Sequence, residues 1–359
     1  MLYQTENPHG GNIYANDIRL DFSASINPLG TPPVVLEAVK SSLRRIDCYP
    51  DPACSKLIEA IAAYENIPSE TILCGNGAAE LIYSFCFSEK PGRALIPVPT
   101  FSEYETALLP TGCEIIHHQM KFAQDFILDE SILDGIAIQR PDVVFLCNPG
   151  NPTGRLISPY ILKEIIALCE INNIRMFVDE CFLDLTGSDR SLTSYLPGHS
   201  CLFILKSLTK TFALPGIRIG YGLSSDKALL KRMSQTVQPW NVSLIAQEAG
   251  VAALKEAEYL EKSIDLIASE REWLTEKLKS FGFSVCLSDA NYILFNAASG
   301  LDKQLRKAGI AIRSCSNFIG LGPGWYRIAV RSHNENQQLI CAINETTEHG
   351  SPASSKEQI

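Results

Sequence analysis

The sequence S-L-T-K-T-F-A-L-P-G-I-R, residues 207–218, places Lys210 in a loop that follows a short apolar run. That run, residues 202–205, is bounded by polar residues and rich in strand-forming side chains, which is typical of a buried strand. Lys210 is therefore expected just beyond the carboxyl end of a strand, where open α/β sheets bind ligands. The stretch predicts an α/β fold with a ligand site built around this lysine.

The residue types around Lys210 indicate what the ligand is. A lysine held away from water and near other cations can lose its proton near neutral pH and form a Schiff base with an aldehyde. Ser207 and Arg218 can offer a hydroxyl and a guanidinium to one phosphate. An aldehyde and a phosphate together describe pyridoxal phosphate. A solvated loop lysine is the commoner outcome for S-x-x-K alone, so this hypothesis depends on the rest of the chain.

Composition predicts an ordinary globular protein. The chain has 359 residues, 46% hydrophobic and 20% charged, which suits one large domain with a smaller one attached. A formal net charge of −9 without a basic run argues against a nucleic-acid surface. The chain shows neither a signal-peptide pattern nor an apolar stretch of membrane-spanning length. We therefore expect a cytoplasmic protein that binds neither nucleic acid nor membrane.

Cysteine usage points to a reduced protein. The 12 cysteines are scattered singly, without a C-x-x-C pair, and most stand inside apolar runs. Such residues are typical of a reduced core rather than of metal ligands or a disulfide framework. We expect no metal site.

Apolar runs of strand length alternate with helical patterns through the first 250 residues. Strands are expected at residues 19–23, 71–74, 94–97, 143–147, 176–178 and 202–205, and helices at 35–46, 54–64, 78–87, after 101 and at 160–171. Apolar strands separated by helices are typical of a parallel sheet covered on both faces. The pattern thus predicts a mainly parallel central sheet flanked by helices.

The pattern changes near residue 250. One face of a long expected helix is apolar, through Leu260, Ile264, Ile267, Leu274, Leu278 and Phe281. Strands are expected at 291–295 and 325–331, which predicts a small C-terminal α+β domain. The expected division is a segment 1–30 packing with the small domain, a large domain 31–250, the small domain 251–345 and a disordered tail 346–359.

Further polar motifs follow the expected strands. The turn Gly75-Asn76-Gly77-Ala78 leads from a strand into a helix, an arrangement that can cradle an anion. Asn151, in C-N-P-G-N-P-T-G, and Asp179, in V-D-E-C-F, also stand at strand ends, and Phe101 follows the strand at 94–97. Each has an ordinary interpretation as a loop, a helix cap or a core residue, and only their combination indicates a cofactor site.

In this order along one α/β chain, the motifs resemble the fold-type I pyridoxal-phosphate enzymes of the aminotransferase class. The resemblance implies pyridoxal 5'-phosphate as cofactor, Lys210 as the Schiff-base lysine and Asp179 as partner of the pyridine nitrogen. It implies that Asn151 bonds the ring oxygen and Phe101 stacks on the ring. The implied phosphate ligands are Gly75, Asn76, Gly77, Ala78, Ser207, Thr209, Arg218 and, from the second subunit of a homodimer with shared active sites, Tyr49.

Other motifs narrow the resemblance. Residues 9–12 (H-G-G-N), 20–30, 49–52 (Y-P-D-P), 99–104 and 315–322 are similar to the threonine-phosphate decarboxylases of cobalamin biosynthesis, over a span from His9 to about Glu345. The histidinol-phosphate aminotransferases share most of the cofactor motifs. Many members of the wider class have a tyrosine three residues after the aspartate, where this chain has Phe182, so the ring oxygen is expected to lack one phenolic donor.

Two arginines near the C-terminal end suit a substrate with two anionic groups. Strand alternation puts Arg327 and Arg331 on one face, roughly 13 Å apart. Surface salt bridges are the ordinary alternative; a phosphorylated amino acid would supply a carboxylate and a phosphate. The resemblance assigns Arg327 to the carboxylate and leaves Arg331, His9 and Asn27 as candidates for the phosphate. The expected substrate contacts are His9, Gly11, Asn27, Asn151, Arg327 and Arg331.

Three functions are considered for these motifs. The resemblance implies decarboxylation of L-threonine O-3-phosphate, and possible use of L-serine O-phosphate, to the aminoalcohol phosphate of the cobamide linker, with Lys210 reprotonating the α-carbon. A histidinol-phosphate-type aminotransferase is the alternative within the same fold. A non-catalytic sensor, as when this fold is attached to a DNA-binding domain, is disfavoured because Lys210 is present and no helix-turn-helix pattern precedes His9.

Overall fold

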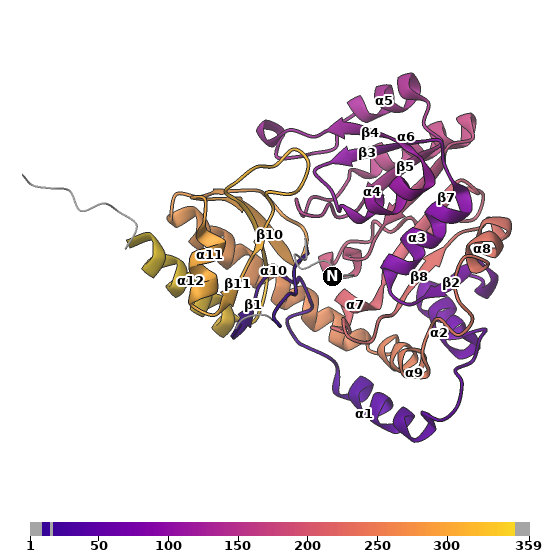
Figure 1. Ribbon diagram of the computed structural model, residues 1–359, viewed down its shortest axis with the longest axis horizontal. Helices are drawn as coiled ribbons and strands as arrows, with labels where there is room; N and C mark the ends of the chain where they lie inside the picture. The colour runs from indigo at the N-terminus through magenta and orange to yellow at the C-terminus, as the bar shows by residue number, and fades with distance from the viewer. Residues whose placement is uncertain (1–8, 15–16, 349–359) are drawn as a thin grey trace, which may run out of the picture.

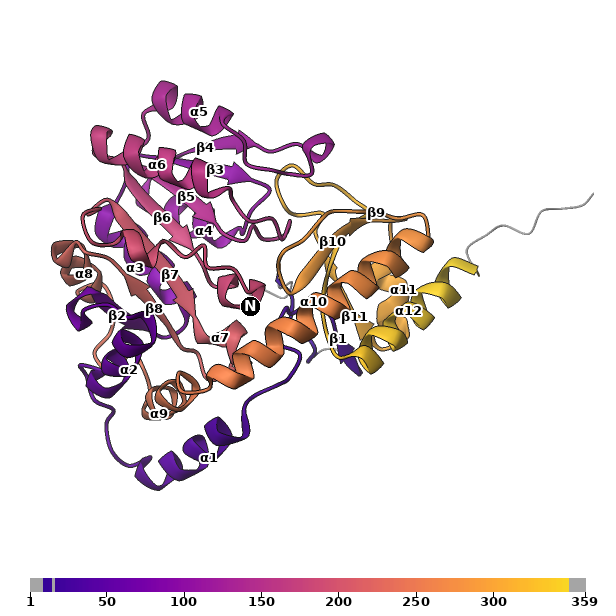
Figure 2. The same cartoon turned by 180° about the vertical axis from the view of Figure 1, so that it is seen from behind.

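The computed structural model describes residues 9–14 and 17–348. A seven-stranded sheet forms the centre of the large part, and a four-stranded sheet the centre of the small part. The long helix α10 (Ala257–Ser280) runs from the large part along the small one (Figure 1, Figure 2). No helix in these described ranges is long and apolar enough to cross a membrane.

The large sheet has the strand order β2-β8-β7-β6-β5-β3-β4. The neighbours from β7 to β4 are parallel, whereas β8 is antiparallel to both β2 and β7. The expected mainly parallel sheet is therefore confirmed, with one reversed strand. The strands are β2 (Ile72–Gly75), β3 (Arg93–Val98), β4 (Glu114–Gln119), β5 (Val143–Cys147), β6 (Arg175–Asp179), β7 (Leu202–Ser207) and β8 (Gly220–Leu223).

Strands β4 and β8 are not indicated by the sequence pattern, for different reasons. Strand β4 lies at the edge of the sheet and exposes polar residues such as His117, so it lacks a buried apolar run. Strand β8 is short and contains two glycines. A Cβ atom at Gly222 would lie 2.3 Å from the ring of Phe203, so the sheet requires glycine there for close approach.

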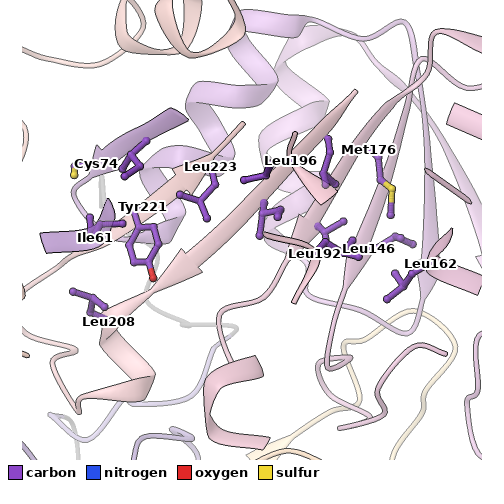
Figure 3. Close-up of a cluster of buried hydrophobic side chains, with 14 of the residues drawn as sticks. Ile61, Cys74, Leu146, Leu162, Met176, Leu192, Leu196, Leu208, Tyr221 and Leu223 are labelled. Atoms are coloured by element: carbon purple, nitrogen blue, oxygen red, sulfur yellow. The ribbon is translucent and has the colours of Figure 1, made fainter. Parts of the chain in front are cut away.

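Helices cover both faces of this sheet and leave its edge of carboxyl ends open. One face packs against α2 (Ser55–Glu65), α5 (Ser131–Gln139), α6 (Pro159–Asn172) and α9 (Leu244–Ala253). Its core, through Leu146, Met176 and Leu223, is drawn in Figure 3. The other face packs against α3 (Ala78–Glu89), α4 (Glu103–Leu108) and α8 (Lys227–Ser234). There Phe85 meets Phe177 edge to face, with ring centroids 4.9 Å apart.

The small part contains an antiparallel sheet of order β12-β13-β10-β9 and receives the N-terminal segment. Strand β1 pairs in parallel with β11, and the backbone N–H of Ala329 donates to Phe22 O at 2.8 Å. The chain just after β1 therefore lies beside the last residue of β13. The remaining elements are β1 (Leu20–Asp21), α1 (Pro33–Ser42), α7 (Leu208–Thr211), β9 (Ser284–Val285), β10 (Tyr292–Asn296), α11 (Leu301–Lys307), β11 (Ile310–Ala311), β12 (Arg313–Ser314), β13 (Trp325–Ala329) and α12 (His333–Glu348).

Among the element ends that differ from the expectation, those of β13 and α12 change a prediction. Strand β13 ends at Ala329, so Arg331 lies beyond it. Helix α12 continues to Glu348, so the expectation of disorder from residue 346 is wrong for its first three residues. The hydroxyls of Thr346 and Thr347 bond back to Ile343 O, and Ile343 is buried, which explains why the last turn persists. Residues 349–359 lie outside the described residues.

Candidate active site

A cavity of about 230 Å³ lies where the carboxyl ends of the parallel strands meet the small part. The structure brings ten of the sequence-predicted residues to its walls. They are His9, Ala78, Phe101, Asn151, Asp179, Ser207, Thr209, Lys210, Arg218 and Arg327.

Lys210 projects from the short helix α7, which begins directly after β7. The Ser207 hydroxyl caps this helix by accepting from the N–H of Thr209 at 3.2 Å, and so fixes the path of the chain next to the lysine. Burial, with Arg327 as the largest charge contribution, lowers the pKa of Lys210 to about 8. A substantial fraction of this amine is thus neutral near pH 8, as a nucleophile requires.

Asp179 ends β6 and lies almost wholly buried in the cavity wall. Its Oδ1 accepts from the N–H of Cys181 at 2.9 Å, and its Oδ2 accepts from the Tyr104 hydroxyl at 2.7 Å. Burial raises the pKa of Asp179, while the hydrogen bonds from Cys181 and Tyr104 act in the opposite direction. Sequence reasoning missed Tyr104; its signal was a position three residues after Phe101 in the same motif.

The glycine turn leads into α3 opposite Arg218. Gly77 has a φ of +80°, and a Cβ atom there would lie 2.5 Å from Nη2 of Arg218, so the turn and the guanidinium require glycine at this position. Gly75, Asn76 and Gly77 were expected to contact the phosphate but do not line the cavity, whereas Ala78 does. Gly75 belongs to β2, and the N–H of Asn76 donates to Glu80 at 2.8 Å, so these two residues form the turn itself.

Arg327 lies on β13 and is buried. Its Nη1 donates to Asn151 Oδ1, and its Nη2 donates to Ser23 O at 3.0 Å. Among the described residues, Arg327 Nε and Ser25 Oγ are buried without a hydrogen-bond partner, and both residues line the cavity. Unpartnered buried donors at one wall fit an anionic group of a ligand.

Arg313 also lines the cavity, although it is not among the site residues expected from the sequence. In the register of β12 and β13 it stands directly opposite Arg327. Burial lowers the pKa of the Arg313 guanidinium to about 10, and the Arg327 charge adds to this effect. The available signal was its position two residues before the motif at 315–322.

Arg331 and Asn27 do not reach the cavity, contrary to the expectation. Arg331 faces the N-terminal segment as strand alternation predicts, but its guanidinium is bound by Glu335 at 2.6 Å and by Asp21 O at 3.2 Å. The Asn27 amide donates to Thr211 O and to Ser263 Oγ, within the protein. Both side chains therefore serve the packing of the segments around the site.

The motif at residues 9–12 presents His9 to the cavity. His9 Nε2 lies 2.8 Å from Glu103 Oε1, and this hydrogen bond lowers the pKa of the Glu103 carboxyl. Gly10 packs against Ser23 so closely that a Cβ atom would lie 2.0 Å from its carbonyl oxygen. Gly11, expected at the substrate, instead donates its N–H to the Ser23 hydroxyl and is not in the cavity wall.

Of the two aromatic residues Tyr49 and Phe182, only Phe182 lines the cavity of its own chain. Tyr49 is 78% exposed and stacks on Trp240, with ring centroids 4.7 Å apart, so it does not contact the cavity of its own chain. Phe182 lines the cavity with its ring 5.5 Å from Lys210 Nζ. The nearby Tyr292 hydroxyl is bound to Gly150 O at 2.8 Å and does not replace the missing phenol.

This fold and this site define a pyridoxal-phosphate-dependent enzyme, and the chain belongs to the aminotransferase class I and II family, whose model matches residues 17–343. The expected fold-type I architecture and cofactor are confirmed. The narrow turn at Gly77, the unpartnered donor of Arg327 and the pKa of Lys210 fit that cofactor and its ligands.

Particular relatives cover nearly the whole chain. The chain is 35% identical to the threonine-phosphate decarboxylase of Salmonella typhimurium, over 96% of this chain and 98% of the relative. It is 32% identical to the histidinol-phosphate aminotransferase of Methanothermobacter thermautotrophicus, over 89% and 86% of the two chains. The crystal structure of the histidinol-phosphate aminotransferase from Clostridium acetobutylicum superimposes with a TM-score of 0.86 at 31% identity, covering 92% of this chain and 99% of that one.

Proposed function

We propose that the protein is a pyridoxal-phosphate-dependent decarboxylase of L-threonine O-3-phosphate, with 1-amino-2-propanol phosphate as product, as a step in making the cobamide linker. The observation that carries this proposal is the pair of opposed arginines, Arg313 and Arg327, in one cavity with Lys210. Two cationic groups suit a substrate with a carboxylate and a phosphate. The similarity to a threonine-phosphate decarboxylase over nearly the full length of both chains supports it.

The large part holds the cofactor in this proposal. When bound, pyridoxal phosphate supplies an electron sink for the charge left on the α-carbon. Asp179 holds the pyridine nitrogen, Asn151 donates to the ring oxygen and Phe101 covers the ring. The cofactor phosphate is bound by the Gly77–Ala78 turn with Ser207, Thr209 and Arg218.

The small part and the N-terminal segment orient the substrate. Arg327 binds the carboxylate through its unpartnered Nε edge, and Arg313 with His9 holds the phosphate. Anchoring both ends of the substrate would orient its carboxylate for loss as CO2, in preference to loss of the α-proton. Lys210, with a pKa of about 8, then donates a proton to the α-carbon.

Serine phosphate is expected to be a second substrate. It presents the same amine, carboxylate and phosphate, and an apolar niche discriminates a single methyl by only about 10- to 200-fold. Free threonine is expected to be a poor substrate, because loss of the phosphate leaves its buried donors unpaired.

The discriminating experiment uses threonine phosphate without any keto acid. Release of CO2 in stoichiometric amounts with the aminoalcohol phosphate, abolished in Lys210→Ala, is the expected result. A histidinol-phosphate aminotransferase is the second candidate, favoured by the similarity of fold and sequence to such enzymes. Amino transfer from histidinol phosphate to 2-oxoglutarate, with no CO2 from threonine phosphate, would establish that candidate instead.

The assembly proposed is a homodimer with shared active sites. Helix α1 packs on α9 and stands away from the large sheet (Figure 1), and the stretch from α1 to the Y-P-D-P motif exposes several apolar side chains. These are Val34, Leu36, Leu43, Ile46 and Tyr49. A second copy would cover them and receive Tyr49 at its cofactor phosphate.

The compartment and the domain limits are also part of the proposal. All 12 cysteines are free, which suits the reducing cytoplasm. The large domain is proposed to span residues 31–250 and the small one 251–348, with the N-terminal segment belonging structurally to the small domain through the pairing of β1 with β11.

A further inference from the structure

Tyr104 is wholly buried, and its hydroxyl donates a hydrogen bond to a buried carboxylate of the cofactor site. Its oxygen donates to Asp179 Oδ2 at 2.7 Å, and Asp179 Oδ1 accepts the backbone N–H of Cys181 at 2.9 Å. The Cys181 side chain also bonds to this carboxylate. Tyr104 does not line the cavity itself. It therefore holds Asp179 from a position outside the cavity wall.

The position of the Tyr104 ring is fixed by its neighbours. It stacks on Phe145 with centroids 5.5 Å apart and meets the edge of Phe101 at 5.7 Å. Phe101, which lines the cavity, stands three residues earlier in the same turn. One short stretch of chain thus determines both the cavity-lining ring of Phe101 and the donor behind Asp179.

Asp179 must be charged if it is to hold a proton on a ring nitrogen. Burial raises the pKa of Asp179 and works against that charge, while the hydrogen bonds donated to the carboxylate act in the opposite direction. Burial also raises the pKa of the Tyr104 phenol, so this group stays a donor throughout the working pH range. Because each carboxylate oxygen has more than one lone pair, these fixed donors leave Asp179 able to accept a further hydrogen bond from a ligand in the cavity that it lines.

We propose that Tyr104 is a positioning residue that keeps Asp179 ionised and aimed at the pyridine nitrogen of the bound cofactor. The inference rests on the cofactor site of the proposed function and not on the identity of its substrate.

The test compares two cofactors on the full chain, prepared as holoenzyme and reconstituted with either one. The first is pyridoxal phosphate; the second is its analogue with a CH group in place of the ring nitrogen, which cannot accept a proton from any carboxylate. Affinity is measured by quenching of tryptophan fluorescence. In Tyr104→Phe we expect binding of pyridoxal phosphate to weaken by about 10- to 100-fold, the range for a hydrogen bond to a charged group, while binding of the analogue is unchanged.

A matched control separates this role from packing. Tyr221 is also fully buried and donates to a carboxylate, Glu65, at 2.6 Å, away from the cavity. Tyr221→Phe is expected to lower thermal stability as Tyr104→Phe does, but to leave the preference between the two cofactors intact. In an Asp179→Asn background, Tyr104→Phe should have no further effect on that preference.

Equal weakening of both cofactors in Tyr104→Phe, or an undiminished effect in the Asp179→Asn background, would overturn the inference and leave Tyr104 a packing residue. No amino-acid substrate enters these measurements. Failure of the wild-type enzyme to release CO2 from threonine phosphate would therefore count against the proposed function alone.

Discussion

Arg313 and Arg327 stand directly opposite each other on the antiparallel strands β12 and β13, and both line the cavity. Two like charges at opposed positions of a sheet repel each other. Such an arrangement is stable when a shared anionic ligand compensates the charges. The pair is therefore the proposed binding place of the substrate's negative charge.

Removing either guanidinium should weaken substrate use much more than cofactor binding. In Arg313→Ala and Arg327→Ala we expect kcat/KM to fall by a factor that corresponds to a loss of about 2 to 5 kcal/mol in transition-state stabilisation, the usual cost of truncating one partner of a buried charge pair. Arg331→Ala is the control, because Glu335 and Asp21 already bind its guanidinium outside the cavity. Steady-state kinetics on threonine phosphate would contradict this assignment if Arg331→Ala were the most damaging of the three.

The pKa of Lys210 predicts a pH dependence of stability in the full chain freed of its cofactor. The folded-state pKa of about 8 lies below the ordinary value of 10.5, so between these pH values the unfolded chain binds more protons. The free energy of unfolding contributed by this group therefore rises from pH 8 to pH 10.5. Denaturant titrations at several pH values should show this rise relative to Lys210→Met. Parallel pH curves for the two proteins would contradict the buried, neutral amine.

Glu103 is expected to hold His9 in place for the substrate phosphate. In Glu103→Gln the charge that orients the imidazole is lost, so KM for threonine phosphate should rise by about tenfold while kcat changes little. Tyr83→Phe is a mild control, since Tyr83 meets the second oxygen of Glu103 at the longer distance of 3.3 Å. Kinetics on both variants, with inorganic phosphate as competitor, measure the effect. A loss confined to kcat would exclude a role in phosphate binding.

Shared active sites predict complementation between two inactive variants. Lys210→Ala removes the lysine of one subunit, and Tyr49→Ala removes the phosphate contact given to the other. Subunits mixed in equal amounts should regain about a quarter of wild-type activity, because half of the dimers are hybrids with one intact site each. Activity after mixing, unfolding and refolding, with size-exclusion chromatography, checks this. Absence of regain in a proven hybrid would place Tyr49 outside the neighbouring site.

Short-range patterns were sufficient to predict the cavity positions of Lys210 and Asp179. Asp179 is the last residue of the buried strand β6, and Lys210 lies in the short helix that follows β7. The carboxyl ends of parallel strands meet at one edge of the sheet. The same rule located Asn151 and Phe101. The mainly parallel sheet was predictable for the same reason, since its central strands are continuous apolar runs.

The remaining contacts depend on relationships that no local pattern contains. Arg313 lines the cavity because the register of β12 and β13 places it opposite Arg327. Tyr104 lies on α4 and donates to Asp179 at the end of β6. The expectation that Arg331 contacts the substrate extends the alternation of side chains along β13 two residues past the end of that strand. Beyond that end, Glu335 in the following helix binds it as an i, i+4 pair.

The N-terminal segment takes part in the small sheet and in the wall of the cavity at once. Strand β1 pairs with β11, and Gly10 packs closely against Ser23. The Ser23 carbonyl oxygen accepts a hydrogen bond from Arg327 Nη2. The wall of the cavity around Arg327 is therefore built from two stretches at opposite ends of the chain. Chimeras that exchange the C-terminal domain alone would pair a foreign arginine with the wrong carbonyl partner, so substrate preference should be transferred between relatives only when both stretches are exchanged together.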